Sequence, residues 1–374
     1  MGRKPRSCIL RRMPPAPPEE ETILLVRLSA IGDVLQCLHA LAALRRARPR
    51  ARIHWLVEDR CAAVLRGHPD LDGVLVYERR ALSREAVRPW LWPRALGRAW
   101  RLVRTLRTLR PTVAVDLQGN LKGALLARLS GAPRRLGLAA GQGGKDFSHR
   151  FATEPVGIPE AARRHRADRA LSLLAPLGAG PADGAVTVGG AREAGPGVEA
   201  WLRDRGLLAG GFVVLHPGTS GYGSMKRWPP GRFAALARAV RDGHGLPVLV
   251  TAGPGEEALA ERVVGESRGA ARRGPETRSL ADLAALLARA AAVVGADTGP
   301  VHLAALLGAP TVALFGPKDP GVYAPRGPRV RVVWKQVWCS PCRLRHCDDP
   351  VCMTELRLDE VLPEVESLLA GRAG

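Results

Sequence analysis

The sequence predicts an α/β protein with two doubly wound parallel sheets. Short apolar runs rich in β-forming residues alternate with segments of helical periodicity. This alternation lapses around residues 177–197, where Gly, Pro and Ala dominate, and then restarts. We place the domain boundary near residue 185 and expect domains over 22–185 and 186–355. Ligands of such sheets lie at the carboxyl ends of the strands, so we expect a cleft between the domains.

The first half opens with a strand that turns into a helix. The run "TILLVRL", residues 22–28, is apolar and rich in β-formers, and a helical pattern follows as far as Pro49. Two further strands are expected over 53–58 and 73–78, with a short helical link between them. The residues expected on the buried side of the first helix are Val34, Leu35, Leu38, Leu41 and Leu44.

Residues 110–131, "RPTVAVDLQGNLKGALLARLSG", predict another strand, a polar turn and a helix. The residues expected on the buried side of that helix are Leu121, Leu125, Leu126 and Leu129. The second half repeats the pattern of strand, turn and helix in three stretches: "GFVVLHPGTS", "LPVLVTAGPGEE" and "AAVVGADTGPVHLAALLGAPTVALFGP".

The formal charge of +21 rests almost wholly on arginine. An arginine bias of the genome explains such a charge, and so does a polyanionic partner. Only 4% of the residues are aromatic and no groove-reading motif is found, so nucleic acid is the weaker partner. An acidic membrane surface or a phosphate-bearing glycolipid fits better.

No apolar run approaches the ~18 residues of a membrane span, so the composition excludes an integral membrane protein. Residues 1–21 are basic, then proline-rich, then acidic, and they lack the apolar stretch of a secretion signal. We interpret them as a flexible leader on a cytoplasmic protein.

Asp33 stands directly after Gly32 at the turn between the first strand and the first helix. A carboxylate here caps a helix well, and capping alone would explain it. Its place at the carboxyl end of a strand also makes it a candidate catalytic group.

In the second half, "GADTGPVH" places Asp297 and Thr298 before a helix that begins at Gly299. Free N–H groups and the helix dipole favour phosphate there, although Pro300 and the small residues serve capping too. His302 is the one polar side chain in the first turn of this apolar helix, and capping does not explain it.

Two other turns carry polar groups. Thr219 and Ser220 could donate to phosphate oxygens while Lys226 supplies a positive charge, or the loop could simply be solvated. A carboxylate of Glu256 or Glu257 could accept hydrogen bonds from a ribose, and two glutamates also suit the start of a helix.

Five motifs in this order resemble the family 9 glycosyltransferases, the bacterial lipopolysaccharide heptosyltransferases. They are "ILLVRLSAIGDVLQCLHALAALRRARP", "VAVDLQGNLKGALLARLSGAPRRLG", "HPGT…KRWP", "GADTGPVHLAALLGAPTVALFGP" and "CSPC…C…CM". The resemblance spans about residues 22–370. The opening "RLSAIGDV" is more similar to heptosyltransferase I, which adds the first heptose to the Kdo of the inner core, than to heptosyltransferase II.

The resemblance implies a GT-B architecture, with an N-terminal domain for the lipid acceptor and a C-terminal domain for an ADP-sugar. It also implies a last helix, within 356–374, that crosses back to the first domain. The apolar residues expected along one side of it are Val361, Leu362, Val365, Leu368 and Leu369.

The resemblance implies inverting transfer of heptose from ADP-heptose to the Kdo of Kdo-lipid A. Asp33 matches the family's proposed general base, and Lys226 would stabilise the leaving phosphate without a metal cofactor. The donor-binding residues so implied are Thr219, Ser220, Glu257, Asp297, Thr298, Gly299 and His302. The acceptor-binding residues so implied are Gly32, Arg79, Arg80, Arg84, Gln118 and Lys145.

Residues 88–110, "RPWLWPRALGRAWRLVRTLRTLR", interleave tryptophan with arginine. They predict either a basic amphipathic helix resting on a membrane or an ordinary helix that packs its Trp and Leu side on the sheet. With the lipid acceptor, the first alternative predicts a cytoplasmic protein peripherally associated with the inner membrane.

Four cysteines follow the spacing C-x₂-C-x₄-C-x₄-C: Cys339, Cys342, Cys347 and Cys352. This crowding is typical of a small zinc site but lacks the usual paired knuckles, so structural zinc is the minor alternative. Two other functions stay open. One is a family 9 transferase with a different sugar or acceptor, such as heptosyltransferase II, and the other is a non-enzymatic protein that binds polyanions.

Overall fold

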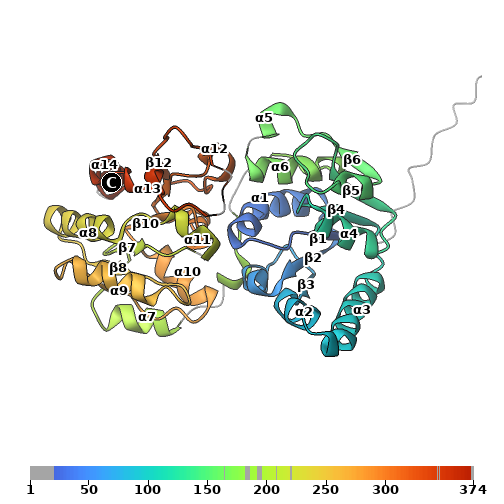
Figure 1. Ribbon diagram of the computed structural model, residues 1–374, viewed down its shortest axis with the longest axis horizontal. Coiled ribbons are helices and arrows are strands. Elements are labelled where there is room, and N and C mark those ends of the chain that lie inside the picture. Colours follow the sequence, from blue (N-terminus) through green and yellow to red (C-terminus); the bar gives the residue numbers. More distant parts are fainter. Residues whose placement is uncertain are drawn as a thin grey trace, which may run out of the picture.

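In a computed structural model, the chain forms two six-stranded parallel sheets, each with helices around it (Figure 1). The residues that the structure describes are 21–163, 165–181, 186–191, 196–207, 209–219, 221–342, 344 and 346–371. The first sheet has the order β3-β2-β1-β4-β5-β6 and the second the order β12-β11-β10-β7-β8-β9. Read from β9, the second order repeats the first, and both are the doubly wound order of nucleotide-binding folds.

The first sheet is made of β1 (Thr22–Val26), β2 (Arg52–Glu58), β3 (Gly73–Tyr77), β4 (Val113–Asp116), β5 (Arg134–Leu138) and β6 (Glu154–Val156). Its helices are α1 (Ile31–Ala47), α2 (Arg79–Ala86), α3 (Trp92–Thr108), α4 (Leu121–Leu129), α5 (Glu160–Arg163) and α6 (Arg166–Leu174). Short 3₁₀ turns add η1 (Asp59–Val64), η2 (Pro89–Leu91), η3 (Ser148–Phe151), η4 (Ala175–Leu177) and η5 (Gly189–Ala191).

The second sheet is made of β7 (Val213–His216), β8 (Val248–Val250), β9 (Ala271–Arg273), β10 (Ala292–Ala296), β11 (Thr311–Phe315) and β12 (Val330–Trp334). Its helices are α7 (Pro196–Arg203), α8 (Pro230–His244), α9 (Glu257–Glu266), α10 (Leu280–Ala288), α11 (Gly299–Leu306), α12 (Pro320–Tyr323), α13 (Val351–Thr354) and α14 (Leu358–Ala370), with the 3₁₀ turn η6 (Gly221–Lys226).

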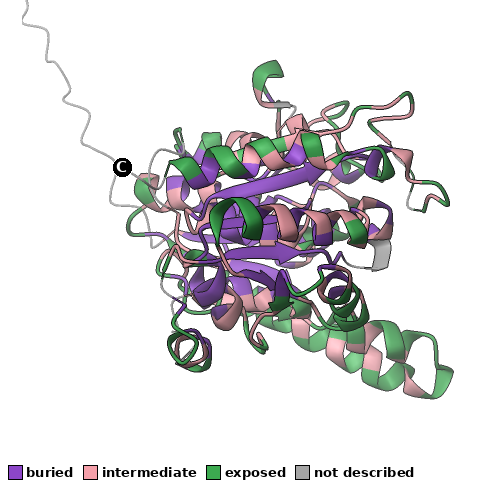
Figure 2. Cartoon of the chain, turned by 90° about the vertical axis from the view of Figure 1, so that its left-hand side faces the viewer, coloured by how far each residue is buried: buried purple, intermediate pink, exposed green. Residues whose placement is uncertain are grey.

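The central strands are buried along their whole length, as in parallel sheets that helices cover on both faces (Figure 2). Their runs of Val, Leu, Ile and Ala therefore match the environment that the fold gives them. The predicted α/β class with two doubly wound sheets is confirmed. All five residues expected on the inner side of α1 are buried, and these are Val34, Leu35, Leu38, Leu41 and Leu44.

Helix α4 turns a different face inward from the one expected. Leu121 and Leu125 are exposed, whereas Leu126 is buried together with small residues of the helix. The cause is Gly123, where an added Cβ would lie 2.3 Å from Oδ1 of the buried Asp116. The small residues must face the sheet for the helix to approach this carboxylate. The prediction of a buried side at Leu121 and Leu125 is wrong.

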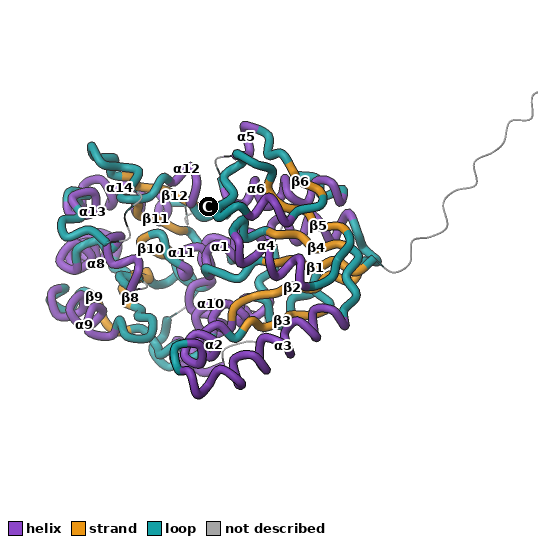
Figure 3. The backbone as a smooth tube through the Cα atoms, turned by 45° about the vertical axis from the view of Figure 1, so that its right-hand side comes forward, coloured by secondary structure: helices purple, strands orange, loops and turns teal. Residues whose placement is uncertain are grey.

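The two sheets share one apolar core. A single cluster of buried residues runs from β1, β2 and α1 into β7, β10, α10 and α11. Helices α1 and α11 pack on each other, and η5 contacts both η1 and α10 (Figure 3). The junction between the sheets is therefore packed like an interior and holds the two halves in a defined position.

The expected domain limits fall partly outside the described residues. The structure does not describe residues 182–185, where we placed the boundary, or residues 1–20 of the leader. Strand β6 ends at residue 156 and β7 begins at residue 213, so the chain passes from one sheet to the other between these positions.

Helix α14 belongs to the second domain. It packs on α8 and on β10, β11 and β12, and Lys335, directly after β12, lies 3.0 Å from Glu360. Four of its five expected apolar residues are buried in the second core, and these are Val361, Val365, Leu368 and Leu369. The apolar side was predicted well, but the expected crossing back to the first domain is corrected, because these side chains complete the second core.

Within the described ranges, every helix is too short or too polar to cross a bilayer.

The orientation of α4, with Leu126 buried and Leu125 exposed, gives a direct test. We expect Leu126→Ala to lower the free energy of unfolding by about 2 to 3 kcal/mol, because it leaves a cavity in the core of the first domain. Leu125→Ala should change it by less than about 0.5 kcal/mol, because that side chain is exposed. Urea unfolding measures both variants, and a larger loss for Leu125→Ala would contradict the observed orientation.

Candidate active site

The first turns of α1 and α11 meet where the two sheets face each other. A Cβ added to Gly32 would lie 2.9 Å from Cδ2 of His302, and one added to Gly299 would lie 3.0 Å from Cγ2 of Ile31. Both glycines are needed for this close approach. Gly32 is one of the residues expected to bind the acceptor, and the side chain of His302 lies directly against it.

Asp33 lies at this junction, in the first turn of α1. Its Oδ2 is 2.8 Å from Nη2 of Arg27 and accepts a hydrogen bond from the Ala30 N–H at 3.2 Å. Its Oδ1 is 3.3 Å from Nη1 of Arg166. The side chain is 22% exposed, so water or a substrate can still reach it. The carboxylate bonds back to the N–H of Ala30, the residue before α1, so Asp33 does stabilise the start of the helix, and its chemical role stays a prediction.

The surroundings of Asp33 set its charge. Burial alone would raise the pKa of its carboxyl group. The positive charges of Arg27 and Arg166 outweigh this effect, together with the hydrogen bond from Ala30, and hold the pKa below its ordinary value of 3.8. Asp33 is therefore ionised at neutral pH.

Arg27 is itself fixed by the fold. It is 5% exposed, and its Nη1 donates to the carbonyl of Leu117 at 2.7 Å. The carbonyl of Arg27 accepts from Nε1 of Trp55 at 3.1 Å. Sequence reasoning missed Arg27. Its position directly after a buried strand was the signal that could have pointed to it.

Gln118 supports the turn that carries Asp33. Its Oε1 accepts from the backbone N–H of Leu28 at 2.9 Å and of Ser29 at 3.4 Å. Below it, Oδ1 of Asp116 accepts from the N–H groups of Gln118 and Gly119, and burial raises the pKa of Asp116 to about 6. The side-chain oxygen that we expected to bind acceptor thus holds the β1–α1 turn.

Arg166 connects Asp33 with the second domain. Its guanidinium lies 4.8 Å from the ring centroid of Tyr323, and its Nη2 is 3.3 Å from the Tyr323 hydroxyl. The neighbouring His165 contacts the carbonyl of Ala324 at 3.0 Å, and Arg326 pairs with Asp168 at 2.6 Å. The segment around α12 is therefore held against α6 through Arg166 and its neighbours.

On the opposite side, Asp297 joins two of the predicted donor-binding residues. Its Oδ2 is 2.5 Å from Nζ of Lys226 and its Oδ1 is 3.0 Å from Nε2 of His302. Burial raises the pKa of Asp297, but His302 and Lys226 outweigh this and lower it to about 2. Nδ1 of His302 lies 3.5 Å from Nε2 of Gln36, so the group formed by Lys226, Asp297 and His302 contacts α1.

Thr298 and Thr219 differ in what their hydroxyls do. Oγ1 of Thr298, at the start of α11, is buried and has no hydrogen-bond partner within the described part of the chain. Oγ1 of Thr219 donates to the carbonyl of Gly223 at 2.9 Å and accepts from Nε of Arg227 at 3.1 Å. Thr298 therefore has a buried hydroxyl whose hydrogen-bonding capacity the described residues leave unused, whereas Thr219 stabilises its own loop. Ser220 lies outside the described residues.

Glu256 directly precedes α9 and Glu257 is its first residue. Of the two, Glu256 lies at the carboxyl ends of the strands. Its Oε2 accepts from the Gly253 N–H at 2.9 Å and lies 3.9 Å from Nε2 of His216. Gly218 makes room for it, because a Cβ there would lie 1.8 Å from the same oxygen. Glu257 is exposed and accepts from the nearby Gly255 N–H at 3.2 Å. Glu256 therefore lies closer to the strand ends, and the choice of Glu257 as the donor-binding glutamate stays a prediction.

The arginines expected on the acceptor side begin at the carboxyl end of β3. Arg79 lies 3.4 Å from the buried Glu58, which also contacts Arg60 at 3.1 Å and Lys122 at 3.8 Å. Three cations around one carboxylate leave an excess of positive charge. Sequence reasoning missed Arg60 and Lys122.

The other expected acceptor residues lie at the surface. Arg80 and Arg84 are exposed on α2, where Nε of Arg84 donates to the carbonyl of Arg80 at 3.4 Å. The side chain of Lys145 is exposed, and its backbone N–H donates to the carbonyl of Gly119, beside Gln118, at 2.9 Å.

The cysteines do not form an evident metal centre. Cys352 is buried against Gly316, where an added Cβ would lie 3.0 Å from its Sγ, and burial raises the pKa of this thiol to about 11. Within the described residues, no three His, Cys, Asp or Glu side chains are placed to hold a metal ion. The alternative of structural zinc gains no support from this arrangement.

Two facing sheets with a carboxylate on one side and a Lys–Asp–His group on the other define an enzyme of the GT-B class. Residues 99–351 match Glycosyltransferase family 9 (heptosyltransferase), so the chain belongs to this family and is a glycosyltransferase. The GT-B architecture that the resemblance implied is thereby confirmed.

Several relatives cover nearly the whole chain. Lipopolysaccharide heptosyltransferase 1 of Pseudomonas aeruginosa is 29% identical over 93% of this chain and 98% of the relative. The structure of E. coli heptosyltransferase WaaC with ADP superposes with a TM-score of 0.73 at 23% identity, over 93% of this chain and 99% of that one. E. coli ADP-heptose lps heptosyltransferase II gives a TM-score of 0.69 at 21% identity, over 94% and 100%.

The ion pair between Lys226 and Asp297 can be tested by a double-mutant cycle. We expect Lys226→Met and Asp297→Asn to show a coupling energy of at least about 1 kcal/mol, because each variant leaves a buried partner uncompensated. Urea unfolding at neutral pH provides the measurement. The exposed pair Arg278–Glu276 is the control and should couple by less than about 0.5 kcal/mol. Additive effects at Lys226 and Asp297 would contradict the pairing.

Proposed function

We propose that the protein transfers L-glycero-D-manno-heptose from ADP-heptose to the Kdo of Kdo-lipid A, with inversion at the anomeric carbon, in lipopolysaccharide inner-core synthesis. The observation that carries the proposal is the position of Asp33. Its carboxylate stands in the first turn of α1, and His302, which Asp297 holds, contacts the same turn from the second domain.

In this scheme, Asp33 is the general base. The acceptor hydroxyl oxygen attacks the anomeric carbon of the heptose while its proton passes to Asp33. The bond from the anomeric carbon to the phosphate oxygen breaks on the opposite face, and ADP leaves with the electron pair. The low pKa makes Asp33 a weak base for a free hydroxyl, so transfer of the proton late in the step, when the hydroxyl has become acidic, suits it best.

The donor would lie against α11. The N–H groups at Gly299, the unpartnered hydroxyl of Thr298 and the imidazole of His302 are placed to hold the diphosphate and the heptose. Lys226 would stabilise the charge of the leaving ADP, with Asp297 fixing its position. Because Lys226 and the start of α11 supply positive charge, the scheme calls for no metal ion.

Other residues would complete the donor site. Glu256 or Glu257 would accept hydrogen bonds from the ribose, while Thr219 would shape the loop that we expect to bear Ser220 on the phosphate side.

The acceptor would approach over the first domain. Kdo-lipid A carries carboxylates and phosphates, and the cations around Glu58 extend towards α2, where Arg80 and Arg84 are exposed. Gln118 would position the turn next to the acceptor, and Lys145 would add a further cation. We infer that the enzyme works at the cytoplasmic face of the inner membrane, where such a lipid is found.

The identity to heptosyltransferase 1 supports this substrate pair. The Pseudomonas aeruginosa relative is 29% identical over 93% of this chain, and lipopolysaccharide heptosyltransferase 3 of E. coli is 22% identical over 90% of it. A family 9 transferase with another sugar or acceptor is the alternative.

We expect purified protein to transfer heptose from ADP-heptose to Kdo₂-lipid A in the presence of EDTA. Asp33→Asn should lower kcat by at least about a hundredfold, because it removes the base and keeps the size of the side chain. Glu276→Gln, at an exposed carboxylate that the scheme does not use, serves as the control and should keep parental activity. Equal rates for the parent and Asp33→Asn would refute the role of Asp33, and transfer only to a different acceptor would refute the substrate.

Arg166 gives a test of the charge around the base. Arg166→Gln removes one of the cations that lower the pKa of Asp33, so this pKa should rise. A larger fraction of Asp33 is then protonated at a given acidic pH, and the acid limb of kcat/KM should move to higher pH. The pH profile of kcat/KM is the measurement, with Arg203→Gln, at an exposed arginine of α7, as the control. If the acid limb of kcat/KM does not move in Arg166→Gln, the ionisation of Asp33 does not determine that limb.

A further inference from the structure

The outer side of the α2–α3 hairpin exposes large apolar side chains. Trp92, Leu96 and Trp100 follow one another at spacings of four residues, so they form a stripe along one side of α3, and all three are more than half exposed. Trp90, in the turn η2 between the helices, is 75% exposed. We define these four residues as the tryptophan stripe.

The opposite side of α3 already packs on the first sheet. Leu106 is buried, and Leu102 and Leu109 pack against the same core as the strands. The core therefore takes up the leucine side of the helix and leaves the tryptophan stripe uncovered. The alternative of a helix packed on the sheet is therefore confirmed for the leucine side only, and the membrane alternative stays a prediction for the tryptophan side.

Positive charge surrounds the stripe. Residues 79–110 contain ten arginines and a single acidic residue, Glu85, which gives a net charge of +9. Glu85 and Glu78 are both paired with Arg98. Arg94 and Arg101 form no ion pair with any other described residue. Among the described residues, most arginines of this hairpin therefore have no acidic partner.

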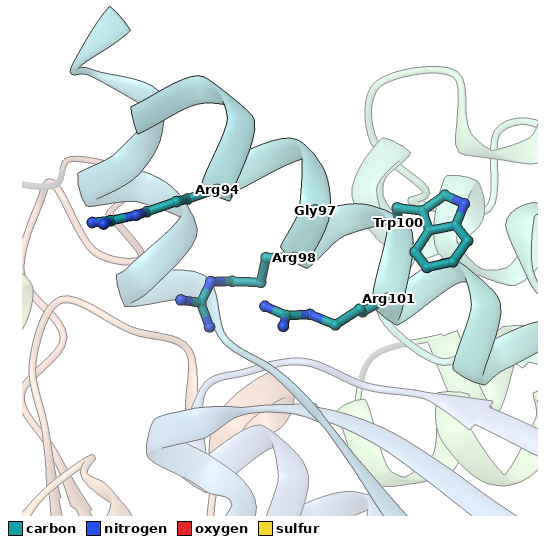
Figure 4. A pocket seen from close by; sticks show the side chains of 5 residues that line it. All are labelled: Arg94, Gly97, Arg98, Trp100 and Arg101. Carbon is teal, nitrogen blue, oxygen red and sulfur yellow. The ribbon is translucent and has the colours of Figure 1, made fainter. Parts of the chain in front are cut away.

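A shallow hollow lies beside the stripe, lined by Arg94, Gly97, Arg98, Trp100 and Arg101 (Figure 4). Gly97 faces open space, because a Cβ added to it would meet no atom within 4 Å. Arg94, Arg98 and Arg101 extend to one side of the helix, and Trp100 lies on the other (Figure 4). An anionic group at the hollow would meet several guanidinium groups next to an apolar surface.

A lipid surface fits this combination better than other occupants do. Tryptophan and leucine can enter the boundary between headgroups and acyl chains, while arginines at the flanks meet anionic headgroups. A second copy placed stripe to stripe would bring two strongly positive segments together. Nucleic acid would match the charge but would leave Leu96 without a base to stack on.

The hairpin also lies at the edge of the sheet where the site is found. Helix α2 starts two residues after β3 ends, and Arg79 at its start contacts Glu58 at the end of β2. The carboxyl ends of parallel strands share one edge, so the hairpin and the turn of Asp33 lie on the same edge of the first domain (Figure 1). A bilayer at the hairpin would thus lie near the route of a lipid-linked acceptor.

We propose that the tryptophan stripe docks the protein on an anionic lipid bilayer, with α3 lying in the plane of the interface and with Arg94 and Arg101, on another side of α3, reaching towards the headgroups. The link to the acceptor rests on the proposed function, whereas the docking itself does not.

Sedimentation with vesicles tests the docking on the full chain. We expect binding to vesicles that contain about one third phosphatidylglycerol, weak binding to pure phosphatidylcholine, and release at high salt. Trp92→Gln/Leu96→Gln/Trp100→Gln and Arg94→Glu/Arg101→Glu should each weaken binding at least about tenfold. The matched controls should bind like the parent. They are Trp338→Gln, at a tryptophan that is 92% exposed elsewhere, and Arg66→Glu/Arg203→Glu, at two other exposed arginines.

The variants must also be shown to be intact. Heptose transfer to a water-soluble Kdo acceptor without acyl chains should be unchanged in both hairpin variants, so a loss of vesicle binding is not a loss of folding. Absence of transfer by the parent as well would refute the proposed function and leave the vesicle result standing.

Three results would overturn the docking proposal. One is equal vesicle binding by the parent and both hairpin variants. Another is a loss of vesicle binding in the control variants that is as large as the loss in the hairpin variants. The third is a parent dimer or a parent complex with RNA that the hairpin variants abolish while vesicle binding persists.

Discussion

The close approach of Gly32 and His302 is the constraint on which the rest of the site depends. Any side chain at position 32 would collide with the imidazole, so the first turns of α1 and α11 can meet only at a glycine. That contact brings Asp33 and the group of His302, Asp297 and Lys226 to the same junction. The two sheets are otherwise separate units, each complete in its own strand order. The shared core behind this contact keeps it in place.

Each side of the junction holds a carboxylate that two cationic or hydrogen-bonding groups keep ionised. Asp33 is held by Arg27 and Arg166, and Asp297 by Lys226 and His302. In both cases burial opposes ionisation and the neighbours outweigh it. The two carboxylates differ in exposure, since the side chain of Asp297 is 9% exposed and that of Asp33 is 22%. Asp297 is suited to holding other groups, and Asp33 is suited to meeting a ligand.

The sequence predicted the fold well because the signals of parallel sheets are local. Apolar runs marked β1, β2 and β10, and helical spacing marked the inner side of α1. Helix α4 was misjudged because its orientation depends on Gly123 lying against Asp116, a contact that periodicity does not contain. The inward position of Glu256 could not be predicted because only the bend before α9 decides which of the two carboxylates turns inward. Arg27 and Arg166 were missed because, among so many arginines, only packing distinguishes the two that contact Asp33.

Arg166 has a consequence for the charge of Asp33. It contacts the carboxylate of Asp33 and also the ring of Tyr323, which belong to opposite halves of the molecule. If the halves separate to admit or release ligands, Arg166 cannot keep both contacts. A movement of Arg166 away from Asp33 would raise the pKa of this carboxyl group, so the charge of Asp33 depends on how the two halves sit against each other.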